Sequence, residues 1–295
     1  MFKKQVNKKT IGLKLGLMLV LALSLSMLAA CGSEDTGADS SEIDSLSGAL
    51  TIEGSDTMVN LAQAWAEQFM DENPNVMITI RGGGSGAGIA SLINGTVDFS
   101  LASRDVREAE FEEGAAVGVE IVEHVTSYDG IAVIVNPASG MTEISKDDLG
   151  KVYRGEITNW SEVGGDDVNI VLLGRDTASG TYAFFEEIIV GDDADYAQSM
   201  RNLATNQAIV DEVRNNPGAV GYVGMGYLVD DVVVLEIDGT LGSIEEVRNG
   251  SYVLARRMLM NSDGEPTGLA RDFLNWVLGP KGQQIVSEEG FVPVD

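Results

Sequence analysis

The sequence predicts an α/β fold of one or two domains with largely parallel sheets, and three observations support this prediction. From residue 49 onward, short apolar segments alternate with amphipathic segments of helical spacing, a pattern typical of strand–helix–strand units. The 295 residues are 44% hydrophobic, which is enough for a sizeable core. No internal repeat or interior low-complexity segment interrupts the alternation.

The first 30 residues have the pattern of a secretory signal peptide. Residues 1–10 are basic, residues 11–28 are apolar apart from Lys14, and the segment ends at Leu28-Ala29-Ala30-Cys31. A basic start, an apolar run and terminal small residues indicate export. The uninterrupted run at 15–30 has 16 residues, which is short for a membrane span of about 20. We therefore expect a cleaved signal rather than a transmembrane anchor.

Residues 28–31 resemble a lipobox, which implies diacylglycerol transfer to Cys31 and cleavage before it. Cys31 is the only cysteine, so the chain can form no internal disulfide and has no second thiol for catalysis or a metal cluster. The alternative is a signal peptide followed by an incidental cysteine. Residues 32–47 are small, polar and acidic, and with Cys31 they predict a lipidated, flexible tether over 31–47.

The first folded unit is predicted to begin with a strand at 49–54 and a helix at 59–70. The helix has Leu61, Trp65 and Phe69 at helical spacing and ends at Asn73-Pro74. The same patterns predict further strands at 76–81, 97–102, 119–125 and 130–136, and helices at 87–94 and 107–116.

A second unit is predicted to begin near Asn136-Pro137. Its helices are expected at 146–153, 179–190 and 206–215, and its strands at 169–174 and 217–224. The remaining chain predicts a strand at 232–237 and helices at 266–278 and 281–288. Periodicity does not assign this last part to either unit.

The net charge excludes several partners. The formal charge is −27, and the first 30 residues hold five lysines and no acid. The rest of the chain has 14 basic groups against 46 acidic ones, a net −32. Such a surface argues against nucleic acid and against electrostatic adhesion to anionic lipid. It also repels small anions, so any anion site has to be a local one.

Three segments share a design in which a strand runs into glycine, serine, threonine or aspartate residues that open a helix. They lie at 54–57, 82–88 and 175–181. Helix starts present unpaired N–H groups, glycine permits close approach of a ligand, and hydroxyls add donors. A single turn of this kind is usually only a helix cap. Three in one chain, one of them with Arg175, favour an oxyanion site.

Signals for enzymes, metals and cofactors are weak. Gly82-x-Gly84-x-x-Ala87 only loosely matches a dinucleotide fingerprint, and no Walker A lysine follows it. His124 is the only histidine, so any Ser–His–acid triad would need a residue in the middle of an apolar strand. The acidic clusters lack calcium-loop spacing. We expect a chain that is not an enzyme, with no catalytic residue, metal or cofactor.

Several segments, taken in order, carry a resemblance to the phosphate-binding lipoproteins of ABC transporters. They are GSDTMVNLAQAWAEQF, GGGSGAGIASLINGTVDFSLASRDV, DGIAVIVNP, YRGEITNW, GRDTASGT, GAVGYVGMGY and GFVPV, within residues 49–295. The resemblance implies a two-lobed periplasmic-binding-protein ("Venus flytrap") fold, type II-like, with phosphate between two α/β lobes. It places two crossovers near 131–136 and 222–226, with lobe 1 at 48–133 plus 225–295 and lobe 2 at 134–224.

The resemblance also implies the ligand-binding residues. Lobe 1 would contribute Asp56, Thr57, Ser85, Gly86, Ser103 and Arg104, and lobe 2 would contribute Arg175, Ser179, Gly180 and Thr181. Arg175 would supply the charge-assisted bond. Hydroxyls at 57, 85, 103, 179 and 181 and amides at 57, 86, 180 and 181 would supply the other donors.

Two positions depart from the family pattern. Arg104 stands after Ser103 where some members have a carboxylate, and Thr177 stands where an aspartate is common, so that the nearest acid is Asp176. Selection of phosphate over sulfate needs an acceptor for the proton that only phosphate carries near neutral pH. Asp56 is our candidate acceptor, with a helix N-cap as its alternative role.

The sequence therefore predicts a monomeric, lipid-anchored receptor on the outer face of the membrane. It would capture inorganic phosphate and deliver it to the transmembrane permease subunits of an ABC transporter. The alternatives are a receptor of the same fold for sulfate, molybdate or tungstate, a phosphate-ester hydrolase, and an adhesion or sensing protein with a vestigial site.

Overall fold

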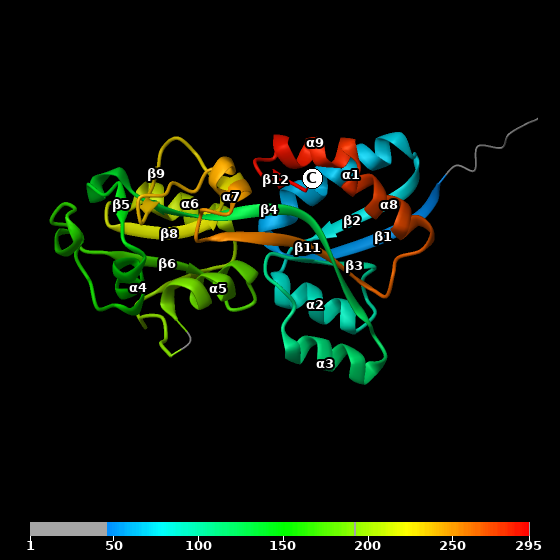
Figure 1. Ribbon diagram of the computed structural model, residues 1–295, viewed down its shortest axis with the longest axis horizontal. Coiled ribbons are helices and arrows are strands. Elements are labelled where there is room, and N and C mark those ends of the chain that lie inside the picture. Colours follow the sequence, from blue (N-terminus) through cyan, green and yellow to red (C-terminus); the bar gives the residue numbers. More distant parts are fainter. Residues whose placement is uncertain (1–45, 192, 295) are drawn as a thin grey trace, which may run out of the picture. The chain divides into compact units, whose positions relative to one another are not determined.

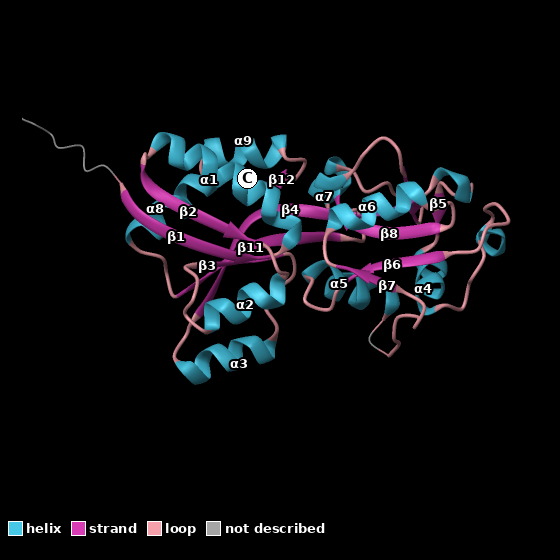
Figure 2. Cartoon of the chain, turned by 180° about the vertical axis from the view of Figure 1, so that it is seen from behind, coloured by secondary structure: helices cyan, strands magenta, loops and turns pink. Residues whose placement is uncertain are grey.

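The computed structural model describes residues 46–191 and 193–294. A ten-stranded mixed sheet runs through both lobes of this part of the chain in the order β2-β1-β3-β11-β4-β8-β6-β7, with β9 and β12 beside β4 (Figure 1; Figure 2). The predicted signal peptide, Cys31 and most of the predicted tether lie outside the described residues. No helix in the described part is long and apolar enough to span a bilayer.

Lobe 1 is built on parallel pairing of β1 with β2 and β3, continued by antiparallel β11. Helices α1, α8 and α9 cover one face of its sheet and α2 and α3 cover the other (Figure 1). Its elements are β1 (Ser47–Gly54), η1 (Asp56–Met58), α1 (Val59–Glu72), β2 (Asn75–Arg81), α2 (Ser85–Ile93), β3 (Phe99–Ala102), α3 (Glu108–Val117), β11 (Ala255–Asp263), α8 (Gly268–Leu278), α9 (Pro280–Glu288) and β12 (Val292–Pro293).

The predicted helical spacing in α1 explains how lobe 1 forms its core. Leu61, Trp65 and Phe69 are buried on one face. The Phe69 ring meets Phe273 of α8 edge-on, with ring centroids 5.1 Å apart, and Trp65 Nε1 donates to the Gly282 carbonyl of α9 at 2.9 Å. The chain's late helices are thereby fixed on its first one.

Lobe 2 is built on β6 between β7 and β8, with both pairs parallel. Its core contains the stacked rings of Phe185 and Tyr222, with centroids 4.0 Å apart, and Tyr153 packs edge-on against Phe185. Its elements are η2 (Pro137–Ser139), β5 (Glu143–Ile144), α4 (Lys146–Arg154), η3 (Trp160–Val163), β6 (Val171–Arg175), α5 (Gly180–Phe185), the π-helical turn η4 (Glu186–Val190), β7 (Arg201–Leu203), α6 (Asn206–Asn215), β8 (Ala219–Gly224), η5 (Met225–Tyr227), β9 (Val233–Val234), β10 (Glu236–Ile237) and α7 (Ile244–Asn249).

One long strand connects the lobes. The two strands predicted at 119–125 and 130–136 form a single strand, β4 (Ile121–Val135). Up to Gly130 it pairs with β11, and from Ile131 it pairs with β8. Asp129-Gly130 has the composition of a turn, but Asp129 is buried against a partner from β11, so the strand continues.

The second crossover differs from the prediction. Residues 225–227 pass beside lobe 1, but β9 then pairs with the lobe 2 end of β4, and Val247, Tyr252 and Leu254 pack in the lobe 2 core. The chain returns to lobe 1, and stays in it, only from the start of β11 at Ala255. By packing, residues 232–254 go with lobe 2, so the predicted boundary at 224/225 falls before this change. The cause is that the apolar residues of this stretch cover lobe 2.

The helix predicted at 179–190 also differs in detail. It forms α5 and then widens into the π-helical turn η4, in which the Gly191 amide donates to the Glu186 carbonyl at 2.8 Å. The other predicted helices agree with the structure to within two residues at each end.

Candidate functional site

The three polar turns singled out in the sequence meet between the lobes. The Thr57 hydroxyl of lobe 1 lies 2.9 Å from the Thr181 hydroxyl of lobe 2. The Gly86 amide at the start of α2 donates to the Ala178 carbonyl of lobe 2 at 3.1 Å. Residues more than 90 positions apart therefore form one polar site, which the lobes enclose on both sides.

The glycines of the second turn permit this close approach. Gly84 has φ +95°, and a Cβ atom there would lie 2.5 Å from the Ala178 carbonyl oxygen. Only glycine combines that backbone conformation with that contact. Gly180 is equally confined, since its Cβ would lie 2.3 Å from Ser85 Oγ and 2.7 Å from Ser103 Oγ.

Two of the three serine hydroxyls of the site already have backbone partners. Ser85 Oγ accepts from the Ser103 amide at 3.0 Å and lies 3.3 Å from Ser103 Oγ. Ser179 caps α5, because its Oγ accepts from the amides of Thr181 and Tyr182 at 3.2 and 3.3 Å. The oxygens of Ser85 and Ser179 are held as acceptors by backbone amides. One proton of the Ser85–Ser103 pair can bridge the two hydroxyls, and the other serine protons are available to an acceptor in the site.

Arg175 is the least satisfied polar group at the site. It ends β6, is 1% exposed, and donates from Nη2 to the Ala204 carbonyl at 2.7 Å. Within the described part of the chain, its Nε and Nη1 have no hydrogen-bond partner. Burial lowers the pKa of this guanidinium, against the opposing effects of Asp56 and Asp176. A buried cation with unfilled donors is costly unless an anion completes it.

Asp56 acts across the lobes. Its Oδ2 accepts from the backbone and side-chain nitrogens of Asn206, both at 3.1 Å, and lies 3.4 Å from Arg175 Nη2. Its carbonyl accepts from the Tyr227 hydroxyl at 2.9 Å. The carboxylate therefore orients Arg175 and the start of α6, and it forms no side-chain cap of η1 or α1.

Arg104 lies near the site but has its own carboxylate. Its two terminal nitrogens bond to Glu110 at 2.8 and 2.7 Å, and Nη1 also donates to the Asp105 carbonyl. The Arg104 guanidinium lies close to the start of α2, because a Cβ atom added to Gly86 would be 3.8 Å from Arg104 Nη2. The sequence predicts Arg104 as a ligand, which no contact in the described structure tests, but its bonds to Glu110 favour a structural role.

Sequence reasoning missed a second buried arginine. Arg256 of β11 donates from Nε and Nη2 to Asp129 Oδ2 at 3.2 and 2.7 Å, and from Nη1 to Thr181 Oγ1 at 2.8 Å. Burial raises the pKa of Asp129 and lowers that of Arg256, although each partner opposes the shift of the other. The available signal was Arg256-Arg257 inside the otherwise apolar segment 252–260.

The only histidine does not form a catalytic dyad. His124 Nε2 lies 2.8 Å from Ser262 Oγ, and that hydroxyl donates to the Gly264 carbonyl at 2.8 Å. With its proton committed, Ser262 has to accept from Nε2–H, so the imidazole cannot deprotonate it. Among residues 46–191 and 193–294, no group of three histidine, cysteine or acidic side chains could hold a metal ion.

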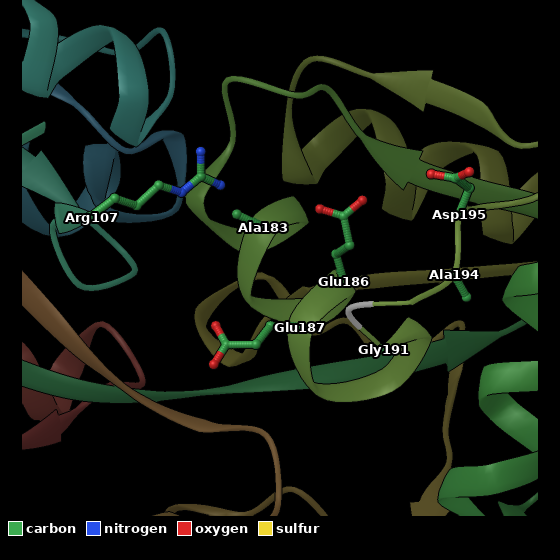
Figure 3. Close-up of a pocket in the computed structure, with 7 residues that line it drawn as sticks. All are labelled: Arg107, Ala183, Glu186, Glu187, Gly191, Ala194 and Asp195. Atoms are coloured by element: carbon green, nitrogen blue, oxygen red, sulfur yellow. The ribbon is translucent and has the colours of Figure 1, made fainter. Parts of the chain in front are cut away.

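A cavity of about 440 Å³ lies beside α5. Figure 3 shows Arg107 reaching into it from lobe 1, while lobe 2 supplies the carboxylates of Glu186, Glu187 and Asp195. Three carboxylates against one guanidinium disfavour an anion here. The enclosed polar region around Arg175 is therefore the better candidate for an anion.

Several known proteins are similar to this chain in sequence and in structure. A family profile described as PBP superfamily domain matches residues 35–281. The phosphate-binding protein PstS of Bacillus subtilis is 38% identical over 95% of this chain and 94% of its own length. PstS of Borreliella burgdorferi is 26% identical over 94% and 98%.

Solved structures agree with these sequence relatives. One described as a phosphate ABC transporter substrate-binding protein of Clostridium perfringens with bound phosphate has a TM-score of 0.79 at 30% identity, covering 84% of this chain and all of that one. An ABC-type phosphate transport receptor from Vibrio cholerae has a TM-score of 0.70 at 25% identity, covering 83% of this chain and all of that one.

Proposed function

Because the chain belongs to the PBP superfamily, and within it to the phosphate-binding proteins of ABC transporters, we propose that it captures inorganic phosphate outside the cytoplasm and delivers it to an ABC permease. The predictions of this family and of its two-lobed α/β fold are confirmed. The proposal requires no reaction by the chain itself, and the relatives are named binding proteins.

One observation carries the proposal at the level of atoms. Arg175 is buried with Nε and Nη1 unpartnered within the described residues, and its neighbour Asp56 directly precedes Thr57, whose hydroxyl meets that of Thr181 from the other lobe. A tetrahedral oxyanion offers several acceptor oxygens to such a set, and bonds from guanidinium to phosphate are charge-assisted. We propose Arg175 as the central ligand, with the hydroxyls of Thr57, Ser85, Ser103, Ser179 and Thr181 as further donors.

Two of the backbone amides predicted to bind phosphate already have acceptors within the protein. The Gly86 and Thr181 amides donate to Ala178 and Ser179, so an anion would have to compete for them. Gly180 serves closure by its lack of a side chain. An anion bound to both lobes would favour the closed form by its contacts with each.

The net charge of −32 outside the first 30 residues is compatible with anion capture. Donors at about 3 Å in a region of reduced dielectric outweigh acids farther away, whose fields salt screens within about 8–10 Å. We also propose that Cys31 carries a lipid anchor and that residues 31–47 tether a monomeric binding domain to the membrane.

Isothermal titration of the protein with phosphate, sulfate and molybdate tests the proposal. We expect one phosphate per chain and much weaker binding of the other anions. Heat with sulfate or molybdate but none with phosphate would contradict the proposal and favour a receptor for another oxyanion. Hydrolysis of a chromogenic phosphomonoester that Arg175→Ala abolishes would favour the hydrolase.

Selectivity is proposed to depend on Asp56. Its carboxylate lies beside the Arg175 guanidinium, where it could accept the proton of phosphate and would repel a bare sulfate oxygen. In Asp56→Asn, the preference for phosphate over sulfate should fall about tenfold, as measured by competition titration. An unchanged preference would assign Asp56 only its contacts with Asn206 and Arg175.

A further inference from the structure

We infer that Arg256 is a positioning residue of the anion site, which, held by Asp129, bonds to Thr181 of the opposite lobe and fixes the Thr181 and Thr57 hydroxyls as donors. This inference rests on the proposed function, because it assigns the hydroxyls a role toward phosphate. It adds a residue pair that the resemblance did not supply.

The guanidinium of Arg256 is held rigidly by Asp129. Asp129 Oδ2 accepts from its Nε and Nη2, and Asp129 Oδ1 accepts from the Met225 amide at 3.1 Å. The side chains of Arg256 and Asp129 are 1% and 0% exposed. A buried guanidinium bonded by two of its nitrogens to one carboxylate oxygen cannot rotate freely, so its remaining nitrogen has a defined position.

That remaining nitrogen spans the lobes. Arg256 Nη1 donates to the Ser103 carbonyl of lobe 1 at 3.3 Å and to Thr181 Oγ1 of lobe 2 at 2.8 Å. The second bond forms only when the lobes are closed. Four hydrogen bonds leave Arg256 little capacity for a ligand of its own, which makes it a positioning residue rather than a ligand.

The bond to Thr181 sets the direction of a proton. A guanidinium can only donate, so Thr181 Oγ1 has to accept and its own O–H points elsewhere. Asn206 acts in the same way on Thr57, because its Nδ2 donates to Thr57 Oγ1 at 3.3 Å. The Gly224 amide donates to Asn206 Oδ1 at 3.3 Å, which fixes the orientation of that side-chain amide.

The Thr57 and Thr181 hydroxyls, 2.9 Å apart, therefore each accept a hydrogen bond from a fixed donor, Asn206 or Arg256. One of them can donate to the other, which leaves at least one O–H directed to a further acceptor, and an anion between the lobes could accept from both. Gly224 closes the back of this arrangement, since a Cβ there would lie 2.6 Å from Thr57 Cγ2 and 3.0 Å from Asp129 Oδ2. Hydroxyls oriented in advance need no rearrangement when phosphate binds.

A double-mutant cycle separates positioning from a general structural role. Phosphate titrations compare the unmodified protein with Arg256→Lys, Thr181→Val and the double variant. Lysine keeps the charge beside Asp129 but lacks the fork that reaches Thr181. We expect Arg256→Lys to weaken phosphate binding about tenfold on its own and less than about twofold in the Thr181→Val background.

Two further variants sharpen the cycle. Thr181→Ser keeps the hydroxyl, so Arg256→Lys should again cost about tenfold in that background. Arg257→Met is the matched control, because Arg257 is the next residue on β11 and pairs with Asp105 at 2.7 Å in a half-exposed position. It removes one positive charge from the same strand and should leave phosphate binding unchanged.

A paired substitution covers the case in which Arg256→Lys does not fold. Asp129→Leu with Arg256→Met removes both buried charges, which proteins often tolerate better than the loss of one. We expect this pair to keep the far-UV circular dichroism of the unmodified protein and to take the place of Arg256→Lys in the cycle, with the same loss of coupling in the Thr181→Val background.

The outcomes distinguish the two proposals. If the unmodified protein binds no phosphate, the proposed function fails and the inference fails with it. If phosphate binds but the Arg256 substitution costs the same factor with and without the Thr181 hydroxyl, or costs nothing, the inference alone is overturned.

Discussion

The two buried arginines at the junction of the lobes differ in how their donors are used. Arg256 forms four hydrogen bonds, to Asp129, Ser103 and Thr181. The Arg175 guanidinium donates to the Ala204 carbonyl, with Asp56 3.4 Å away, and its Nε and Nη1 have no partner among the residues that the structure describes.

The difference indicates that Arg256 supports the structure of the site, whereas Arg175 is available to bind the anion. An arginine with its donors filled stabilises the fold that contains it. An arginine with unfilled buried donors lowers the stability of the ligand-free protein and is useful only when an anion completes its bonds. Burial alone would not distinguish the two residues, because both are almost inaccessible.

The largest expected effect is on phosphate binding by Arg175→Met. Because the unfilled donors of Arg175 are the proposed ligands, affinity should fall at least about a hundredfold, as measured by calorimetry. The free energy of unfolding of the ligand-free protein should stay the same or rise. Arg201→Met, which removes an exposed partner of Glu212, is the control, and equal losses in both variants would contradict the assignment.

Arg256→Met should show the opposite balance. Removing it leaves Asp129 buried without its cation, so the free energy of unfolding should fall by about 3–5 kcal/mol, measured by chemical denaturation without phosphate. Adding Asp129→Leu should recover most of the lost free energy of unfolding. A stable Arg256→Met protein would remove the distinction between the two arginines.

Gly180→Ala tests whether phosphate binding requires close contact between the two lobes, which brings the two arginines to one site. The new methyl group would meet Ser85 and Ser103 of the opposite lobe, so phosphate affinity should fall about tenfold or more while unfolding changes little. Gly86→Ala, whose Cβ would lie 3.6 Å from the Ala178 oxygen, should cost less. Equal losses would show that contact between the lobes is not the cause.

A substitution of Arg104 tests whether an arginine whose donors are already bonded within the protein contributes to phosphate binding. Both of its terminal nitrogens are bonded to Glu110, as those of Arg256 are bonded to other groups. We therefore expect Arg104→Met to weaken phosphate binding by less than about threefold. A loss comparable to that of Arg175→Met would make Arg104 a direct ligand.

The smallest effect is a change in acid stability. Burial by itself would raise the pKa of Glu110, but bonds from Arg104 and from the Arg107 amide outweigh it, so the pKa is lowered. Its contribution is therefore complete above the ordinary pKa near 4.5 and is lost as the pH falls through the lower, folded-state value. Denaturation from pH 6 to 3 should show Glu110→Gln losing less stability than the unmodified protein.

Local patterns predicted the parts of the site that are local. The spacing of Leu61, Trp65 and Phe69 predicts α1, and each of the three polar turns has its own sequence signature. Because the turns follow strands that end on facing edges of the two lobes, the fold brings them together.

The parts that were missed depend on contacts between distant segments. Asp129 and Arg256 are 127 residues apart, and nothing in either strand alone indicates that the two side chains form a pair. Asp129-Gly130 has the composition of a turn, and only the buried partner on β11 explains why β4 runs through it. Asn206 was predicted only as a helix start, while its contact with Asp56 requires the closed lobes.

A crystal structure of the protein grown with phosphate tests the central claim most directly. The account predicts a phosphate between the lobes, with its oxygens about 2.7–3.1 Å from Nε and Nη1 of Arg175, and Arg256 still bonded to Asp129 and Thr181. A phosphate bound elsewhere, or one that takes Arg256 away from Asp129 and leaves Arg175 without a partner, would contradict it.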